Sequence, residues 1–158
     1  MTHNDIIRRL RYTFDFNDNK MISIFALVEC DVTREQLSNW LKKDDDPNYK
    51  ACNGTTLAYF LNGLIIEKRG KKPGVQPEIE KDLNNNMVFN KLKIALSLKS
   101  DDILDIMQSS DFRMSKHELS AFFRKPTHKH YRECKDQILR NFLQGIQLKY
   151  RNTPIEEA

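Results

Sequence analysis

The sequence predicts an all-α protein built from two tandem copies of one four-helix unit. Composition points to helices, because five Gly and five Pro in 158 residues are too few for the turns of a sandwich or barrel. Hydrophobic residues at 39% and charged residues at 30% suit amphipathic helices around a core. The chain also repeats itself at an offset of 82 residues, and a helix-capping pattern recurs at that same offset.

The repeat holds without a gap over most of the chain. Identical residues meet at this offset in the pairs Asn4/Asn86, Leu10/Leu92, Ile24/Ile106, Leu37/Leu119, Tyr49/Tyr131, Cys52/Cys134, Leu57/Leu139 and Arg69/Arg151. The period is too long for a solenoid, so it indicates a domain duplication related by a pseudo-two-fold axis. We expect a first copy at residues 1–70, a linker at 71–85, a second copy at 86–151 and a fraying tail at 152–158.

The first two helices of each copy are expected from apolar spacing and caps. Residues 5–14 carry apolar side chains at helical spacing, with Asn4 as the N-cap. A second helix is expected over residues 19–28. Its counterpart is expected to begin after Ser100, Asp101 and Asp102, where acids favour the positive end of the helix dipole.

The third and fourth helices carry the clearest local signals. Thr33 and Gln36 form a capping box, and Ser115 and Glu118 repeat it at the same offset. The fourth helix is expected over residues 55–68, with a glycine inside it, Gly63, that recurs as Gly145 in the second copy. Either these glycines permit close approach of another helix, or they are tolerated without a role.

The second and third helices with their short turn resemble a helix-turn-helix. The expected inner positions are Ala26, Cys30, Val32, Thr33, Leu37 and Trp40, and in the second copy Gln108, Phe112, Met114, Ser115, Leu119 and Phe122. Two interpretations stay open, a helix pair that contacts DNA or a helix pair that only packs.

The second copy is the more basic of the two. Residues 113–151 hold ten Lys and Arg against three acids, an excess of seven positive charges, whereas the whole chain has a net charge of +4. If the protein binds nucleic acid, we expect the contacts to come from the third helix of the second copy and the loop after it, through Lys116, Arg124, Lys125, Lys129, Arg132 and Lys135. The first copy has Asp44, Asp45 and Asp46 beside the equivalent positions, and acids repel phosphates.

The sequence gives little support for metal binding or catalysis. His128, His130 and Cys134 could ligate zinc, but the histidines have no counterparts in the first copy and no paired ligand motif is present, so we expect a solvated basic loop. No catalytic constellation is evident, and we expect neither an enzyme nor a cofactor. Three cysteines without a CxxC pair and the absence of a long apolar run predict reduced thiols in a cytoplasmic protein that does not contact membranes.

The chain resembles the YehS-like family of uncharacterised bacterial proteins, which carry two tandem copies of their domain. The resemblance covers residues 4–151 and is carried by the stretches 4–12 (NDIIRRLRY), 40–45 (WLKKDD), 60–70 (FLNGLIIEKRG), 85–104 (NNMVFNKLKIALSLKSDDIL) and 128–145 (HKHYRECKDQILRNFLQG). It implies a small cytoplasmic bacterial protein and supplies no activity or site residues. The sequence alone therefore favours a non-enzymatic adaptor that binds another protein, with nucleic-acid binding through the second copy as the alternative.

Overall fold

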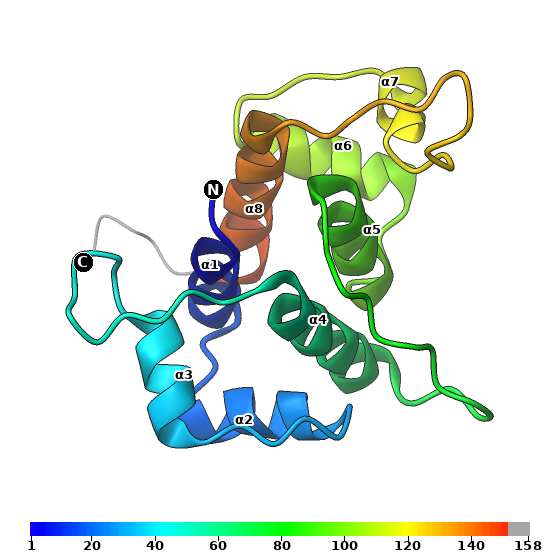
Figure 1. Ribbon diagram of the computed structural model, residues 1–158. Coiled ribbons are helices and arrows are strands. Elements are labelled where there is room, and N and C mark those ends of the chain that lie inside the picture. Colours follow the sequence, from blue (N-terminus) through cyan, green and yellow to red (C-terminus); the bar gives the residue numbers. More distant parts are fainter. Residues whose placement is uncertain (152–158) are drawn as a thin grey trace.

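The structure, a computed structural model, describes residues 1–151 and contains eight helices and no strand within them (Figure 1). The first copy consists of α1 (His3–Phe14), α2 (Asp18–Ala26), α3 (Arg34–Leu41) and α4 (Gly54–Arg69). The second copy consists of α5 (Asn85–Ala95), α6 (Ser100–Ser109), α7 (Lys116–Ala121) and α8 (Asp136–Tyr150). The prediction of a duplicated four-helix unit is confirmed. The tail expected at 152–158 lies outside the described residues.

The expected N-cap of α1 was wrong. The helix begins at His3, and Thr2 caps it: Asp5 N donates to Thr2 Oγ1 at 3.0 Å, and Thr2 N donates to the Asp5 carboxylate at 2.9 Å. This reciprocal box satisfies two backbone donors at the helix start, which a cap at Asn4 would leave unpaired. The Asn4 side chain is 1% exposed and bonds elsewhere in the fold.

The bounds of α2 and α6 also differ from the sequence-based expectation. Helix α2 runs from Asp18 to Ala26 and does not reach Val28, because the chain turns at Glu29, which has a φ of 60°. The equivalent turn after α6 places Asp111 at a φ of 62°. Helix α6 starts at Ser100, not after it, because Lys99 N donates to the Asp102 carboxylate at 2.8 Å and fixes the first turn there.

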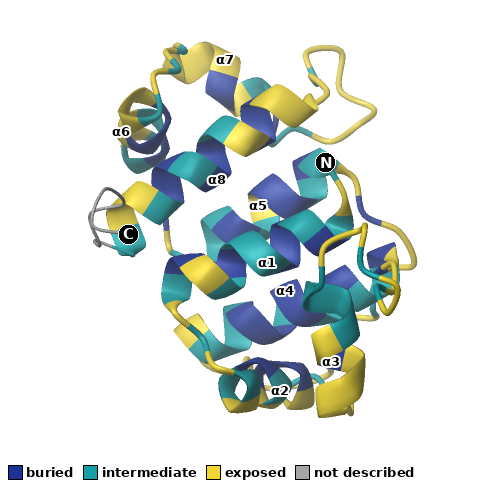
Figure 2. Cartoon of the chain, turned by 90° about the vertical axis from the view of Figure 1, so that its left-hand side faces the viewer, coloured by how far each residue is buried: buried dark blue, intermediate teal, exposed yellow. Residues whose placement is uncertain are grey.

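Both predicted capping boxes are confirmed, and they begin two short surface helices. In α3 and α7 one residue each is buried, Leu37 and Leu119, and both helices are largely exposed (Figure 2). Of the inner positions expected for a helix-turn-helix, Val32, Leu37, Leu119 and Phe122 are buried, but the expectation was wrong for Ala26 and its counterpart Gln108, which are exposed. Ala26 points outward because α2 ends there and presents its other face to the core.

The two copies pack through reciprocal helix contacts. Helix α1 packs on α8, and α5 packs on α4; at the offset of 82 these two contacts are equivalent, as a pseudo-two-fold relation requires. The pairs α2/α3 and α6/α7 lie at opposite ends of the molecule (Figure 1). A unit of this size buries little surface alone, so exchanging contacts between first and last helices gives both copies one shared core. No helix described in residues 1–151 is long and apolar enough to cross a membrane.

Polar contacts across the interface follow the same symmetry. The Arg9 guanidinium on α1 donates to Gln144 Oε1 on α8. At the equivalent positions, the Lys91 ammonium on α5 donates to Asn62 Oδ1 on α4 at 2.7 Å. A cation on the first helix of each copy therefore bonds an amide on the last helix of the other, which fixes how the copies are aligned.

The segment between α4 and α5 contains no helix, yet its second half is tied to the body. Leu83 is buried, and Lys91 pairs with Glu80 at 2.7 Å. Burial works to raise the pKa of the Glu80 carboxyl, but the hydrogen bond and charge of Lys91, together with hydrogen bonds from the Glu80 backbone and Asn62, outweigh it, and the net pKa is below its usual value. Glu80 is thus held as an anion that anchors the segment at α5.

Candidate nucleic-acid interface

The loop that follows α7 is held by one buried asparagine of α5. Asn86 Nδ2 donates to the carbonyl oxygens of Phe122, at 3.1 Å, and Arg132, at 2.8 Å. Asn86 Oδ1 accepts from Cys134 N at 2.8 Å. The amide therefore uses both donor hydrogens and its oxygen to fasten the two ends of the loop to the body of the second copy.

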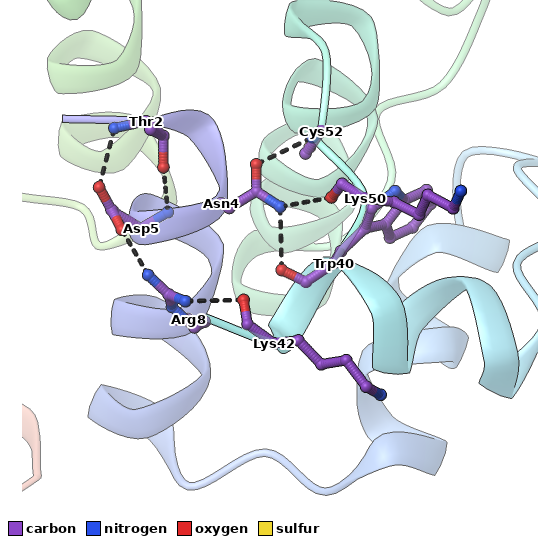
Figure 3. A network of polar contacts seen from close by, with 8 residues as sticks. All are labelled: Thr2, Asn4, Asp5, Arg8, Trp40, Lys42, Lys50 and Cys52. Carbon is purple, nitrogen blue, oxygen red and sulfur yellow. Dashed lines mark hydrogen bonds and ion pairs between the residues drawn. The ribbon is translucent and has the colours of Figure 1, made fainter. Parts of the chain in front are cut away.

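The first copy contains the same three hydrogen bonds of an asparagine, and we call this arrangement the clamp. Asn4 donates to the carbonyl oxygens of Trp40 and Lys50, both at 2.9 Å, and accepts from Cys52 N at 2.9 Å (Figure 3). The sequence analysis had assigned Asn4 to the N-cap of the first helix, and the only sign of this other role was its identity with Asn86 at the offset of 82. A polar residue that recurs on an otherwise apolar helix face was the available signal.

The two loops have equivalent backbone hydrogen bonds, in addition to the equivalent contacts with Asn86 and Asn4. In the second copy, His128 N donates to Lys125 O at 2.9 Å, Tyr131 N to His128 O at 3.0 Å and Arg132 N to Ala121 O at 3.1 Å. In the first copy the equivalent bonds run from Asp46 N to Lys43 O at 3.0 Å, from Tyr49 N to Asp46 O at 3.0 Å and from Lys50 N to Asn39 O at 3.1 Å. Even a side-chain cap recurs, since Asp46 Oδ1 accepts from Asn48 N and His128 Nδ1 accepts from His130 N.

The side chains on this shared backbone differ in charge. The first loop presents Asp44, Asp45 and Asp46, whereas the second presents Pro126, Thr127 and His128 at the same places. The next residue changes from Pro47 to Lys129. Because the backbone bonds are the same, neither set of charges is required to form the loop.

Three of the six predicted basic residues have carboxylate partners. Lys116 lies 3.3 Å from Asp101, Arg132 lies 3.8 Å from Glu118 and Lys135 lies 3.2 Å from Glu133. The Ser115 backbone N–H donates to Glu118 and holds the pKa of that carboxyl below its usual value, so Glu118 stays an anion beside Arg132. These pairs are exposed and weak, but they leave little net charge at the three positions.

The other three, Arg124, Lys125 and Lys129, have no carboxylate partner within residues 1–151. Lys125 and Lys129 are exposed. Arg124 is half-buried, and its Nε is shielded from solvent without a hydrogen-bond partner in the described part of the chain. The cations without a carboxylate partner thus lie beyond α7, which ends at Ala121, in the turn after the helix and in the first half of the loop, a shorter stretch than the sequence had predicted.

The three weak zinc candidates do not converge on one point. His128 and His130 are exposed neighbours whose ring centroids lie 5.6 Å apart. Cys134 is buried, and its Sγ donates to Lys135 O at 3.7 Å. Within residues 1–151, no three His, Cys, Asp or Glu side chains are grouped as metal ligands.

We expect the three cysteines of the described residues to differ in reactivity. Burial raises the pKa of Cys52 and of Cys134 to about 12, and Asp136 and Glu133 add to the shift at Cys134. Burial and Asp31 also raise the pKa of the half-buried Cys30. Since the thiolate is the reactive form, iodoacetamide at neutral pH should label Cys30 first and the other two only after denaturation, as peptide mass spectrometry would show. Labelling of Cys52 or Cys134 in the folded protein as fast as Cys30 would contradict this assignment.

Two hollows on the described surface bear on the charge of the site. One, of about 400 Å³, adjoins the basic loop and is lined by Asn84, Asn85, Asn86, Tyr131, Glu133 and Cys134. The other, of about 610 Å³, lies where α1 meets the end of α8 and is lined by Arg8, Arg11, Tyr12, Asp15, Phe16, Asn17, Leu41 and Arg151. Its three arginines each pair with an aspartate, namely Arg8 with Asp5, Arg11 with Asp18 and Arg151 with Asp15. The second hollow therefore has no excess of positive charge to attract an anion.

Comparison with known proteins agrees with the duplication. Residues 3–70 and residues 85–152 each match the family described as "Protein of unknown function (DUF1456)". The chain is also 47% identical over 149 residues to "Uncharacterized protein YehS" of Escherichia coli (strain K12), covering 92% of this chain and 94% of that protein. No solved structure matches the chain significantly. The resemblance to YehS-like proteins is confirmed, and the chain belongs to the DUF1456 family, with two tandem copies of the family's domain.

Proposed function

We propose that this protein is a non-enzymatic nucleic-acid-binding protein and that its second copy supplies the contact surface. One observation carries the proposal: the same clamped loop presents acids in the first copy and unpaired cations in the second. Because the fold does not need those cations, a partner is the better reason for them. A partner that meets several clustered cations with no carboxylate of their own is an anion with repeated charges.

An adaptor that binds another protein has less support. The large hydrophobic side chains exposed within residues 1–151 are Tyr12 on α1, Leu148 on α8, which packs on α1, and Val75 on the segment between α4 and α5. Protein-binding faces of the apolar kind are contiguous patches of several hundred Å², which needs more than these three side chains. A cytoplasmic location is part of the proposal, and the three free thiols in the described residues agree with it.

Charge reversal in the second loop should weaken nucleic-acid binding at least tenfold, on the order of the loss expected when two phosphate contacts are removed. The variant is Lys125→Glu with Lys129→Glu, because both side chains are exposed and their loss should leave the fold intact. Arg124 is kept, since its half-buried side chain would combine packing with charge. Fluorescence anisotropy of a labelled oligonucleotide at about 50 and about 200 mM salt measures affinity and its salt dependence.

The matched control reverses two exposed lysines in the first copy, Lys43→Glu with Lys50→Glu. Lys43 is the equivalent of Lys125, and the change in net charge is the same. The proposal predicts little effect from the control. Equal loss of oligonucleotide affinity in both variants would indicate nonspecific electrostatic attraction. No binding by the unmodified protein at low salt would contradict the proposal. Co-purification from cells with nuclease treatment would then test the adaptor, since a protein partner would survive the nuclease.

A further inference from the structure

We infer that the second loop binds single-stranded nucleic acid, with its phosphates on the loop cations and its bases on exposed rings. The inference rests on the proposed function and narrows it to a class of ligand. It depends on three features of the second copy: the length of α7, the rings beside the cations, and the hollow that adjoins the loop.

Helix α7 is poorly suited to reading duplex DNA. It has six residues, so it rises only about 9 Å, whereas a recognition helix places three or four side chains along the major groove. Lys116 at its start pairs with Asp101, and the exposed Glu118 would face phosphates with a negative charge. The usable cations lie past the helix, on a loop that cannot enter a groove as a helix does.

The loop combines cations with flat rings, as single-strand sites do. His128 and His130 are both exposed and alternate with Lys129, while Lys125 lies one turn before them. Bases of an unpaired strand stack on aromatic or histidine rings, and the backbone follows the positive charge. A duplex hides its base faces and could use only the cations.

Hydrogen bonds between side chains and the loop backbone order the loop before any ligand arrives. Asn86 fixes both ends, and the bond from His130 N to His128 Nδ1 at 3.0 Å fixes the ring-bearing turn. The adjoining hollow of about 400 Å³ is lined by Tyr131, by the three asparagines Asn84, Asn85 and Asn86, and by Glu133 and Cys134. A hollow of that volume is at the small end of ligand sites. Asn85 Nδ2 already donates to Cys134 O and to the Asp136 carboxylate, and Asn84 Oδ1 caps α5, so the groups left for the edge of a base are Asn85 Oδ1 and Asn84 Nδ2. An ordered loop loses less entropy on binding than a mobile one.

The test compares three labelled probes of about 16 nucleotides, a length that spans typical single-strand sites: oligouridine, oligothymidine and a hairpin duplex. Anisotropy titrations with the full chain should show at least one single strand bound roughly tenfold more tightly than the duplex. Preference for oligouridine would identify RNA as the source through its 2′-hydroxyl, and similar affinities would identify any single strand. Either result supports the inference.

Removing the rings should then lower single-strand affinity while leaving the salt dependence unchanged. His128→Asn with His130→Asn keeps a side-chain acceptor for the turn and should weaken single-strand binding roughly tenfold. His130→Phe keeps a flat ring and should retain most of the affinity. The control is Asp46→Asn, which alters the equivalent turn of the first copy and should have no effect.

The outcomes separate the inference from the proposed function. Equal affinity for hairpin and single strands, or full affinity without the rings, overturns the inference and leaves nucleic-acid binding standing. Binding to none of the three probes at low salt overturns both.

Discussion

Gly63→Ala and Gly145→Ala should each destabilise the protein, although alanine is the better helix former. A Cβ added at Gly63 would lie 2.2 Å from the Ile24 carbonyl oxygen, and one added at Gly145 would lie 2.3 Å from the Ile106 carbonyl oxygen. Real Cβ atoms do not approach backbone that closely. Each substitution must therefore push α4 away from α2, or α8 away from α6.

Two opposing effects act on the free energy of unfolding, the higher helix propensity of alanine and the overpacking caused by its Cβ. Replacing a helix-interior glycine by alanine stabilises by about 1 kcal/mol where space allows. Overpacking in a close-packed core costs about 1–3 kcal/mol, and a clash with backbone belongs at the upper end because no side chain can rotate away. We expect a net loss of at least about 1 kcal/mol in the free energy of unfolding for each variant.

Urea unfolding followed by circular dichroism measures this loss. Arg140→Ala, on the exposed face of α8, is the control and should change the midpoint little. A midpoint that stays the same or rises for the glycine variants would mean that the helices separate at little cost and that helix propensity prevails.

Local patterns explain what the sequence could predict. Capping boxes such as Thr33 with Gln36 depend on residues three positions apart, so they are legible in the sequence and appear in the structure. The repeat offset identified Gly63 and Gly145 as equivalent, but whether they mark a close approach stayed open. That answer required knowing which helix crosses each glycine, and helical periodicity says only which face is apolar.

The features that the sequence could not predict depend on partners far apart along the chain. Asn4 was expected to cap α1, but its partners lie on α3 and the following loop, far along the chain. Which of the predicted cations carry net charge was equally hidden, because Arg132 meets Glu118 only after the loop folds back on α7. The exchange of contacts between α1 and α8 also could not be read from periodicity, since either copy's last helix offers an apolar face.

The paired asparagines give the second large prediction. Asn86→Ala and Asn4→Ala each remove three hydrogen bonds and leave two carbonyls and one N–H without their partner. A buried polar group left unsatisfied costs about 1–3 kcal/mol, so each variant should lose about 3 kcal/mol or more of unfolding free energy. Asn86→Asp should be no better, because a carboxylate oxygen would replace the NH₂ that faces two carbonyl oxygens.

Binding should separate the two variants even though their stabilities fall together. Asn86 fastens the loop that we propose as the nucleic-acid contact, whereas Asn4 fastens the acidic loop. Asn86→Ala should therefore weaken oligonucleotide binding through loss of loop order, while Asn4→Ala, measured at a temperature where circular dichroism shows both variants folded, should bind like the unmodified protein. Equal loss of binding in both variants would tie binding to overall stability, and unchanged binding in both would mean that the cations act without the scaffold. A loss confined to Asn86→Ala would assign the clamp a role in binding that its twin in the first copy does not share.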